Sequence, residues 1–239
     1  MAAPKIILYT NHRCPWAHRA HIALKELGLD YEEVIIDLNK PREPWYLEIN
    51  PRGLVPTISY NGTIIPESAI VTQLLADAHP SHLAPPSNTP EGAIKRAHIS
   101  FFVDTFVGKI WSQTFATIRA TSDEDRNTGT EALVAAIEKN DLGGLLYPPG
   151  SGSGPFFHGS DHITLAEALT GSFLLRLLSF HKSQYGLLGA ELPTLLEKRA
   201  PKFYSWAQAV VAQESVNYIW DEEEVGKATA AKVKSLAKV

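Results

Sequence analysis

The chain has 239 residues, of which 44% are hydrophobic and 20% charged, and its formal net charge is −4 at pH 7. This composition is typical of a globular chain with enough apolar residues for a sizeable core, and the lack of a basic excess argues against a nucleic-acid partner. No apolar stretch reaches the ~20 residues of a membrane span, and the opening segment MAAPKIILYT has no basic or apolar signal region, so we expect a cytoplasmic protein without a membrane partner.

The first segment predicts alternating strands and helices. Residues 5–10, KIILYT, are β-branched and apolar, as in a buried strand. A helix is expected over 15–27, where apolar residues recur at helical spacing until Gly28, and a second strand is expected over 31–37. These elements form a βαβ unit with parallel strands and a right-handed crossover.

A hairpin and a helix are expected to complete this unit. Two prolines within residues 38–50 predict a loop with one irregular turn. Residues 54–60 and 63–66 flank an Asn-Gly pair, which is a strong signal for a β-hairpin. A helix over 67–78 follows.

The rest of the chain predicts helices. Four prolines within residues 79–92 mark a boundary between a small α/β domain over 1–80 and an all-helical domain over 91–239. The sequence TLAE places Thr164 and Glu167 as a capping box. Helices are expected over 91–120, over 123–140, from Thr164 onward, over 200–213 and over 221–237, with a loop rich in Gly, Pro and Ser over 146–164.

Cys14 is the only cysteine, and it directly precedes Pro15 at the expected start of a helix. Free backbone N–H groups and the positive end of the helix dipole should lie beside the sulfur and lower the pKa of the thiol. Four neighbours in the sequence are able to add positive potential: His12, Arg13, His18 and Arg19. The alternative is an inert cysteine packed as a small hydrophobe. Because there is no second cysteine, a disulfide of Cys14 requires a thiol from outside the chain.

Three ordered motifs resemble those of cytosolic glutathione transferases: Cys-Pro at 14–15, NPRGLVPTI over 50–58 and ESAI over 67–70. With the helical second half, the resemblance covers nearly the whole chain. The cysteine makes it similar to the omega-like, cysteine-type class. CPWAHR alone also resembles the glutathionyl-hydroquinone reductases, but these are longer and have a different strand motif. The resemblance implies an α/β thioredoxin-like N-terminal domain plus an all-α C-terminal domain, with glutathione as co-substrate.

The resemblance also implies the residues of the site. Cys14 would be the catalytic residue, with Tyr9 and Ser68 as competitors for that role. Pro56 would be a cis proline that turns the backbone of Val55 toward the cleft, where an extended tripeptide can pair as an added strand; the alternative is a trans proline at a sheet edge. The expected glutathione-binding residues are Cys14, Pro15, Trp16, Lys40, Val55, Pro56, Glu67 and Ser68.

Both charged ends of glutathione have expected partners. Ser68 and the nearby N–H groups would bind the γ-glutamyl carboxylate, and Glu67 would bind the ammonium. The alternative is that Glu67 and Ser68 only cap the helix, and both roles can hold at once. Lys40 would lie near the glycyl carboxylate, with Arg42 as the alternative. The alternative is that each of these cations is only a solvated surface residue.

The second substrate, a hydrophobic or electrophilic small molecule, is expected between the domains. The candidate residues are Phe102, Phe106, Trp111 and Trp220, although aromatics at helical spacing more often form core. His158 and His162 would align as metal ligands only on a helix. Because their segment reads as a loop, we expect no metal.

The expected activity is that of a glutathione-dependent thiol transferase or reductase, acting through a mixed disulfide between Cys14 and glutathione. One alternative is conjugation or isomerisation of an electrophilic small molecule, as in detoxification or secondary metabolism. Another is a non-catalytic regulator that binds glutathione. The two-fold dimers usual in the family imply a homodimer.

Overall fold

A computed structural model describes residues 3–236 of the chain. Its first part contains β1 (Ile6–Thr10), α1 (Pro15–Glu26), β2 (Glu32–Ile35), α2 (Pro44–Ile49), β3 (Thr57–Tyr60), β4 (Thr63–Pro66) and α3 (Ser68–Ala78). The second part is helical: α4 (Pro90–Thr105), the π-helical turn η1 (Phe106–Trp111), α5 (Ser112–Ile118), α6 (Asp123–Lys139), α7 (Leu142–Leu146), the 3-10 turn η2 (Phe157–Gly159), α8 (Leu165–Ser179), α9 (Leu192–Arg199), α10 (Pro201–Val211), α11 (Glu214–Asn217) and α12 (Glu222–Leu236). The thioredoxin-like α/β part followed by an all-α part agrees with the predicted fold class.

The four strands form one mixed sheet in the order β2-β1-β3-β4. β1 and β2 are parallel, as the βαβ reading predicts, whereas β3 runs antiparallel to both β1 and β4. Asn61 and Gly62 join β3 to β4 with φ of 51° and 86°. Two positive φ angles are what a type I′ hairpin turn requires, so the predicted hairpin is confirmed.

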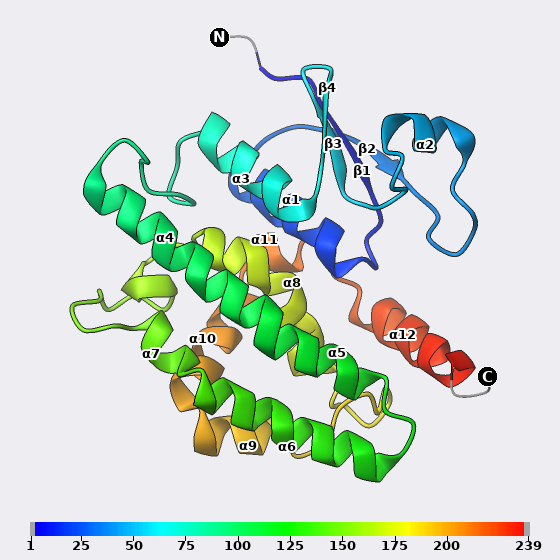
Figure 1. The fold of residues 1–239 in the computed structure, drawn as a ribbon, viewed down its shortest axis with the longest axis vertical. Helices are drawn as coiled ribbons and strands as arrows, with labels where there is room; N and C mark the ends of the chain where they lie inside the picture. The colour runs from blue at the N-terminus through cyan, green and yellow to red at the C-terminus, as the bar shows by residue number, and fades with distance from the viewer. Residues whose placement is uncertain (1–2, 237–239) are drawn as a thin grey trace.

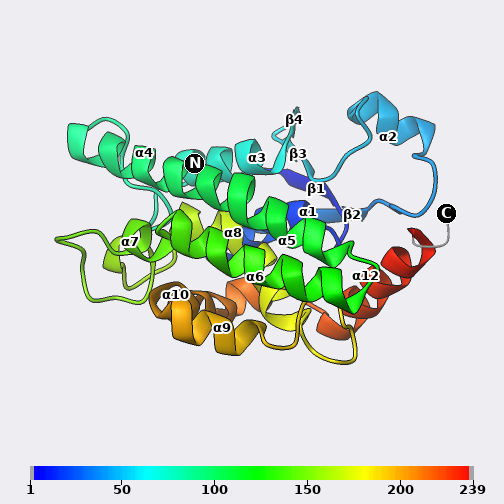
Figure 2. The ribbon, with the colours of Figure 1, turned by 60° about the horizontal axis from the view of Figure 1, so that its bottom comes forward.

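Two helices lie between the sheet and the helical part (Figure 1). α1 and α3 pack against each other, and both contact α8 on their other side. Figure 2 shows α5 and α6 side by side in the layer beyond. One hydrophobic core runs through all these layers, from Leu8 in the sheet through Leu24 and Leu75 to Phe173 and Trp206. The division into folding domains at 1–80 and 91–239 stays a prediction, since one core joins the two parts.

Several helices differ from their predicted extent. The helix expected over 91–120 is interrupted by η1. α2 lies inside the predicted loop 38–50, because Pro44 occupies the first helical position, where its missing N–H has no cost. The short helices α7, α9 and α11 were not expected at all. Residue 237, at the end of the last predicted helix, lies outside the described residues.

The predicted capping box of α8 is present. Thr164 Oγ1 accepts a hydrogen bond from the Ala166 N–H at 3.1 Å, and the Thr164 N–H donates to Glu167 Oε2 at 2.7 Å. The other carboxylate oxygen of Glu167 accepts from Trp206 Nε1 and from the Phe157 N–H, both at 2.8 Å. This one carboxylate therefore joins α8, α10 and the loop before α8.

Across residues 3–236, no helix combines the length and the apolar character needed to cross a membrane.

Candidate active site

Cys14 ends a tight turn between β1 and α1. The Cys14 N–H donates to the Asn11 carbonyl at 3.0 Å, and the Asn11 side chain holds the turn by accepting from the Arg13 N–H and donating to the Ile36 carbonyl. Pro15 is the first residue of α1, and no side chain among residues 3–236 caps the helix. The first N–H groups of α1 are therefore directed to the neighbourhood of the sulfur.

The loop before β3 brings a backbone carbonyl to this sulfur. The Val55–Pro56 peptide bond is cis, as predicted, and Cys14 Sγ lies 4.0 Å from the Val55 carbonyl oxygen. Tyr46 Oη donates to the Leu54 carbonyl at 2.5 Å, and Asn50 Nδ2 donates to the same carbonyl at 3.0 Å. Tyr46 and Asn50 thus fix the loop that carries Val55, a role that sequence reasoning missed.

Burial raises the pKa of the Cys14 thiol, which is the largest influence on it. The backbone N–H groups of Ala17 and Trp16 and the guanidinium groups of Arg176 and Arg19 lower the pKa, but they do not cancel the effect of burial. The expectation of a lowered pKa is therefore wrong for this structure. The reason is that the half-buried sulfur packs against an apolar cluster of Tyr9, Ala17, Ile36, Tyr46 and Val55, where a thiolate loses hydration.

Two buried arginines lie close to Cys14. Arg19 donates to the Leu169 carbonyl at 2.7 Å and to Ser68 Oγ at 3.1 Å, and its Nη2 has no hydrogen-bond partner among the described residues. Arg176 donates to the Ser172 carbonyl at 2.7 Å and the Arg13 carbonyl at 2.9 Å. Burial lowers the pKa of Arg19 to about 9 and that of Arg176 to about 10. Both remain cationic at neutral pH. Arg176 comes from α8, and no local sequence signal links it to Cys14.

The start of α3 holds the two polar residues that the ESAI motif predicts. Glu67 has φ of 76° and pairs with Arg52 at the surface. Ser68 is buried, and its hydroxyl accepts from Arg19. Glu67 makes no side-chain hydrogen bond to the helix, so capping by Glu67 does not occupy the first N–H groups of α3.

Lys40 and Arg42, the two candidate cations in the segment 38–50, make different contacts. Arg42 donates at 2.8 Å to each of three carbonyls, those of Gly53, Asp37 and Lys40. Its guanidinium therefore holds the loop together. Lys40 is exposed and lies 3.6 Å from an Asp37 oxygen, which leaves Lys40 as the candidate for a carboxylate partner.

The aromatic candidates for the second-substrate site divide into two groups. Phe102 and Phe106 are 0% and 1% exposed and pack in the core, so neither can contact a substrate from solvent and their assignment is wrong. Their helical spacing marks an inward face whose partners, among them Trp206 and Phe203, fill the space. Trp111 is 8% exposed and lies 4.6 Å from the Phe173 ring.

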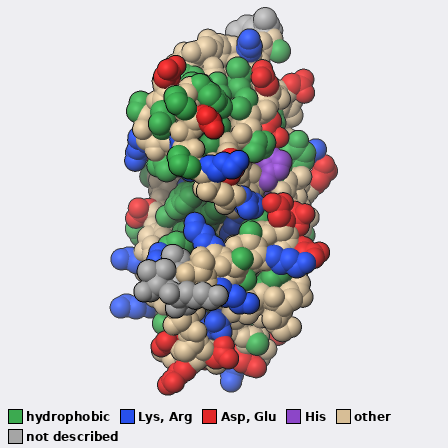
Figure 3. Space-filling view, turned by 90° about the vertical axis from the view of Figure 1, so that its right-hand side faces the viewer, with side chains coloured by type: hydrophobic (Ala, Val, Ile, Leu, Met, Phe, Trp, Pro, Cys, Tyr) green, Lys and Arg blue, Asp and Glu red, His purple; other side chains and the backbone are tan. Residues whose placement is uncertain are grey.

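Other aromatics are more exposed than these, among them Trp16 in the first turn of α1. Trp16 is 37% exposed and meets the Phe173 ring edge-on at 4.9 Å. Trp220 is partly buried, with the Arg176 guanidinium 4.9 Å above its ring. Phe115, half exposed and beside Trp111, was missed, although it follows Trp111 by four residues, at helical spacing. Figure 3 shows a hollow with hydrophobic walls on one face of the molecule, between its upper and lower parts.

The remaining candidates have other surroundings. Tyr9 is buried against Tyr46, at 5.7 Å between ring centroids. His158 faces His98, and His162 faces His82, so the two imidazoles of the HGSDH segment point to different neighbours.

A family model of the glutathione S-transferase N-terminal domain matches residues 13–78. Glutathione S-transferase omega-1 from Mus musculus is 29% identical over 175 residues, which is 72% of this chain and 67% of the mouse protein. The omega-1 enzyme from Rattus norvegicus is 34% identical over 137 residues, or 56% of this chain and 54% of the rat protein.

Solved structures match over almost the whole chain. Glutathione transferase Omega 2C from Trametes versicolor is 28% identical with a TM-score of 0.78, over 96% of this chain and 99% of that one. Omega 1C from the same organism is 25% identical with a TM-score of 0.77, over 97% and 98%. The chain therefore belongs to the glutathione transferases, the enzymes that use glutathione as co-substrate, and is omega-like among them.

Proposed function

We propose that the protein is a thiol transferase that removes glutathione from mixed disulfides through Cys14. The observation that carries the proposal is the placement of Cys14 Sγ at an uncapped helix start, 4.0 Å from the Val55 carbonyl oxygen. A cysteine in this position favours disulfide exchange, because its sulfur occupies the place where the thiolate of a bound glutathione would otherwise be stabilised.

The reaction proceeds in two exchanges. The Cys14 thiolate attacks the glutathione sulfur of a mixed disulfide, the old S–S bond breaks, and the released thiolate takes up a proton. A second glutathione thiolate then attacks the glutathione sulfur on Cys14, which yields oxidised glutathione and restores the Cys14 thiolate. The net change converts one mixed disulfide and one glutathione into a free thiol and oxidised glutathione. The cycle is ping-pong, since the first product leaves before the second glutathione reacts.

Glutathione would lie along the edge of the sheet. The Val55 backbone would pair with its peptide, Ser68 and the free N–H groups of α3 would bind one carboxylate, and Glu67 would bind the ammonium. Lys40 would meet the other carboxylate, and Pro15, Trp16 and Pro56 would contact the tripeptide. The proposed location of the enzyme is cytoplasmic.

The second substrate would contact the exposed Trp16 and the two aromatics kept from the predicted set, the partly buried Trp220 and Trp111, of which 8% is exposed. Trametes versicolor Omega 2S, 25% identical to this chain, was solved with 2,4-dihydroxybenzophenone. A flat aromatic compound is thus a ligand of one similar protein, and Trp16 and Trp220 present suitable faces here. Glutathionyl ketones, quinone adducts and dehydroascorbate are further proposed substrates.

A homodimer would use the groove between α3 and α4. Apolar side chains of Ile70, Leu74, Val103 and Val107 line this groove, and Ile70 is 57% exposed. Exposed apolar surface of this kind is typical of a buried contact between copies. Sedimentation of the wild type and of Ile70→Glu tests it: the variant should be monomeric.

A second function, isomerisation or conjugation of an electrophile, is favoured by other relatives. A zeta class enzyme from Euphorbia esula is 36% identical over 93 residues, and a probable maleylacetoacetate isomerase from Caenorhabditis elegans is 34% identical over 100 residues. In this reaction glutathione itself is the nucleophile, and Ser68, Tyr9 or backbone groups would stabilise its thiolate.

Replacement of Cys14 separates the two functions. Cys14→Ala should abolish turnover of a small glutathione mixed disulfide while glutathione still binds, as measured by calorimetry. Tyr9→Phe is the matched control and should retain the activity. Equal disulfide turnover in Cys14→Ala would refute the proposal, and an increase in conjugation of an aryl halide by that variant would favour the second function.

A further inference from the structure

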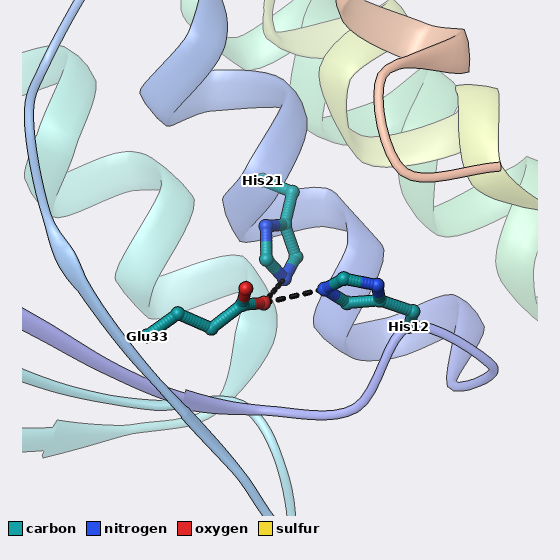
Figure 4. Close-up of side chains that lie close together, drawn as sticks. All are labelled: His12, His21 and Glu33. Carbon is teal, nitrogen blue, oxygen red and sulfur yellow. Dashed lines mark hydrogen bonds and ion pairs between the residues drawn. The ribbon is translucent and has the colours of Figure 1, made fainter.

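Three potential metal ligands converge from three segments of the chain (Figure 4). His12 belongs to the turn after β1, His21 to α1 and Glu33 to β2. Nε2 of His12 lies 2.5 Å from Glu33 Oε1, and Nε2 of His21 lies 3.5 Å from the same oxygen. One donor atom from each residue falls within 4.8 Å of the others. No role in the proposed chemistry explains this cluster.

The fold itself creates the convergence. Parallel pairing places Glu33 opposite Leu8 on the neighbouring strand, and α1 brings His21 to the Glu33 carboxylate. The Asn11 side chain fixes the turn that carries His12 by its bond to the Ile36 carbonyl. The three residues are 9 to 21 positions apart in the chain, with no metal-binding spacing, so the sequence gives no signal of the cluster.

His21 has the surroundings of a metal-ligating imidazole. Its Nδ1 lies 2.9 Å from Tyr31 Oη, which fixes the ring plane and directs Nε2 toward Glu33. A partner on the second ring nitrogen is the usual means by which proteins orient a histidine ligand.

The distances suit a small tetrahedral ion. Bonds of about 2.0–2.2 Å to nitrogen and oxygen place the ligand atoms of a tetrahedral zinc ion about 3.3–3.6 Å apart. The separation of 3.5 Å between His21 and Glu33 already fits. The separation of 2.5 Å between His12 and Glu33 must widen, and these side chains are 41% and 31% exposed, which leaves room for it. The Thr10 hydroxyl, now 2.8 Å from His21 Nε2, would give up this contact.

From this geometry we propose that His12, His21 and Glu33 bind a divalent transition-metal ion, with Zn²⁺ as the fitting choice. Two imidazoles and one carboxylate favour zinc over the harder calcium and magnesium ions. Three protein ligands leave a fourth position for water on the exposed side, where His12 and Glu33 reach the surface. The inference does not depend on the proposed thiol transfer.

Titration of the full-length, untagged chain with Zn²⁺ and Co²⁺ tests the proposal. Cys14→Ser is used as the parent, because its thiolate would otherwise be a competing ligand. We expect one bound ion per chain by calorimetry and the visible absorption of tetrahedral Co²⁺. Affinity should fall by about 100-fold or more in His12→Ala and Glu33→Gln, since loss of an outer partner alone costs about 10- to 100-fold.

Two further variants make the result specific. Tyr31→Phe removes only the partner of His21 Nδ1 and should weaken binding about tenfold. His82→Ala is the matched control, because His82 and Glu26 form a surface histidine–carboxylate pair at 2.8 Å outside the cluster, and it should bind zinc as the parent does. Absence of saturable 1:1 binding by the parent, or unchanged affinity in both His12→Ala and Glu33→Gln, would overturn the proposal. If His12 and Glu33 had only a structural role, their substitution would change the stability of the variants but not their affinity for zinc.

Discussion

The starts of α1 and α8 use their polar groups in opposite ways. At α8, Thr164 and Glu167 form a complete capping box, and the buried Glu167 carboxylate also accepts from Trp206 and Phe157. At α1, no side chain in the described part of the chain accepts from the first N–H groups, and the residue at the N-cap position is Cys14. One helix start is saturated with internal hydrogen bonds, whereas the other retains unused donors.

The buried polar side chains near the two helix starts also differ in how many hydrogen-bond partners they have. Glu167 has a hydrogen-bond donor on both oxygens, whereas Arg19 keeps an unpartnered Nη2, and neither ring nitrogen of His18 makes a well-formed hydrogen bond within the described residues. Unpaired buried donors cost free energy. The comparison indicates that α8 stabilises the fold, while the α1 region gives up stability to keep hydrogen-bonding capacity near Cys14.

The largest expected effect is that of Glu167→Ala, at the start of α8. This change leaves Trp206 Nε1 and the Phe157 N–H buried without an acceptor and removes the capping box, so the free energy of unfolding should fall by about 4 kcal/mol. Urea denaturation measures the loss. Thr164→Ala, which removes only the cap, should lose about 1 kcal/mol. Losses of equal size in the two variants would show that the bonds to Trp206 and Phe157 add nothing.

A smaller effect is expected on the α1 side at acid pH, through His18. Burial lowers the pKa of His18 well below its usual value, Arg176 adds to the shift, and the Val216 backbone opposes it without cancelling it. The unfolded chain takes up a proton below its ordinary pKa of about 6.5, whereas the folded chain does not. Stability from His18 is therefore present above pH 6.5 and lost as the pH falls, by about 2 kcal/mol at pH 5.

Urea denaturation at pH 7.5 and pH 5 measures this loss. In His18→Leu the difference in the free energy of unfolding between the two pH values should shrink by about 2 kcal/mol. The contribution of His21, whose pKa is also lowered by burial, should remain. An unchanged pH dependence in this variant would mean that His18 is protonated in the folded protein, and the contrast with Glu167 would then fail.

The same two regions show what could be predicted from the sequence. The capping box, the hairpin and the βαβ unit depend on residues close together in the chain, and each is confirmed. The cis bond at Pro56, which the family resemblance implied, is also confirmed. The pKa of Cys14 depends on packing against Tyr9 and Val55 and on Arg176 from α8. Local patterns carry no information on such distant contacts. For the same reason, helical spacing could not distinguish the core residues Phe102 and Phe106 from residues that line a site.

The smallest expected effect is on the pKa of Cys14, and it tests whether the buried Arg176 lowers that pKa. Arg176 lowers the pKa of the Cys14 thiol, although burial raises it overall. Arg176→Met should raise that pKa further, so that alkylation by iodoacetamide near neutral pH slows several-fold. Arg176→Lys keeps a positive charge and should retain most of the rate. Because the fully ionised thiolate reacts in every variant, the rates should converge at high pH. A uniform slowing at all pH values would instead indicate that Arg176 only supports the turn through its bond to the Arg13 carbonyl.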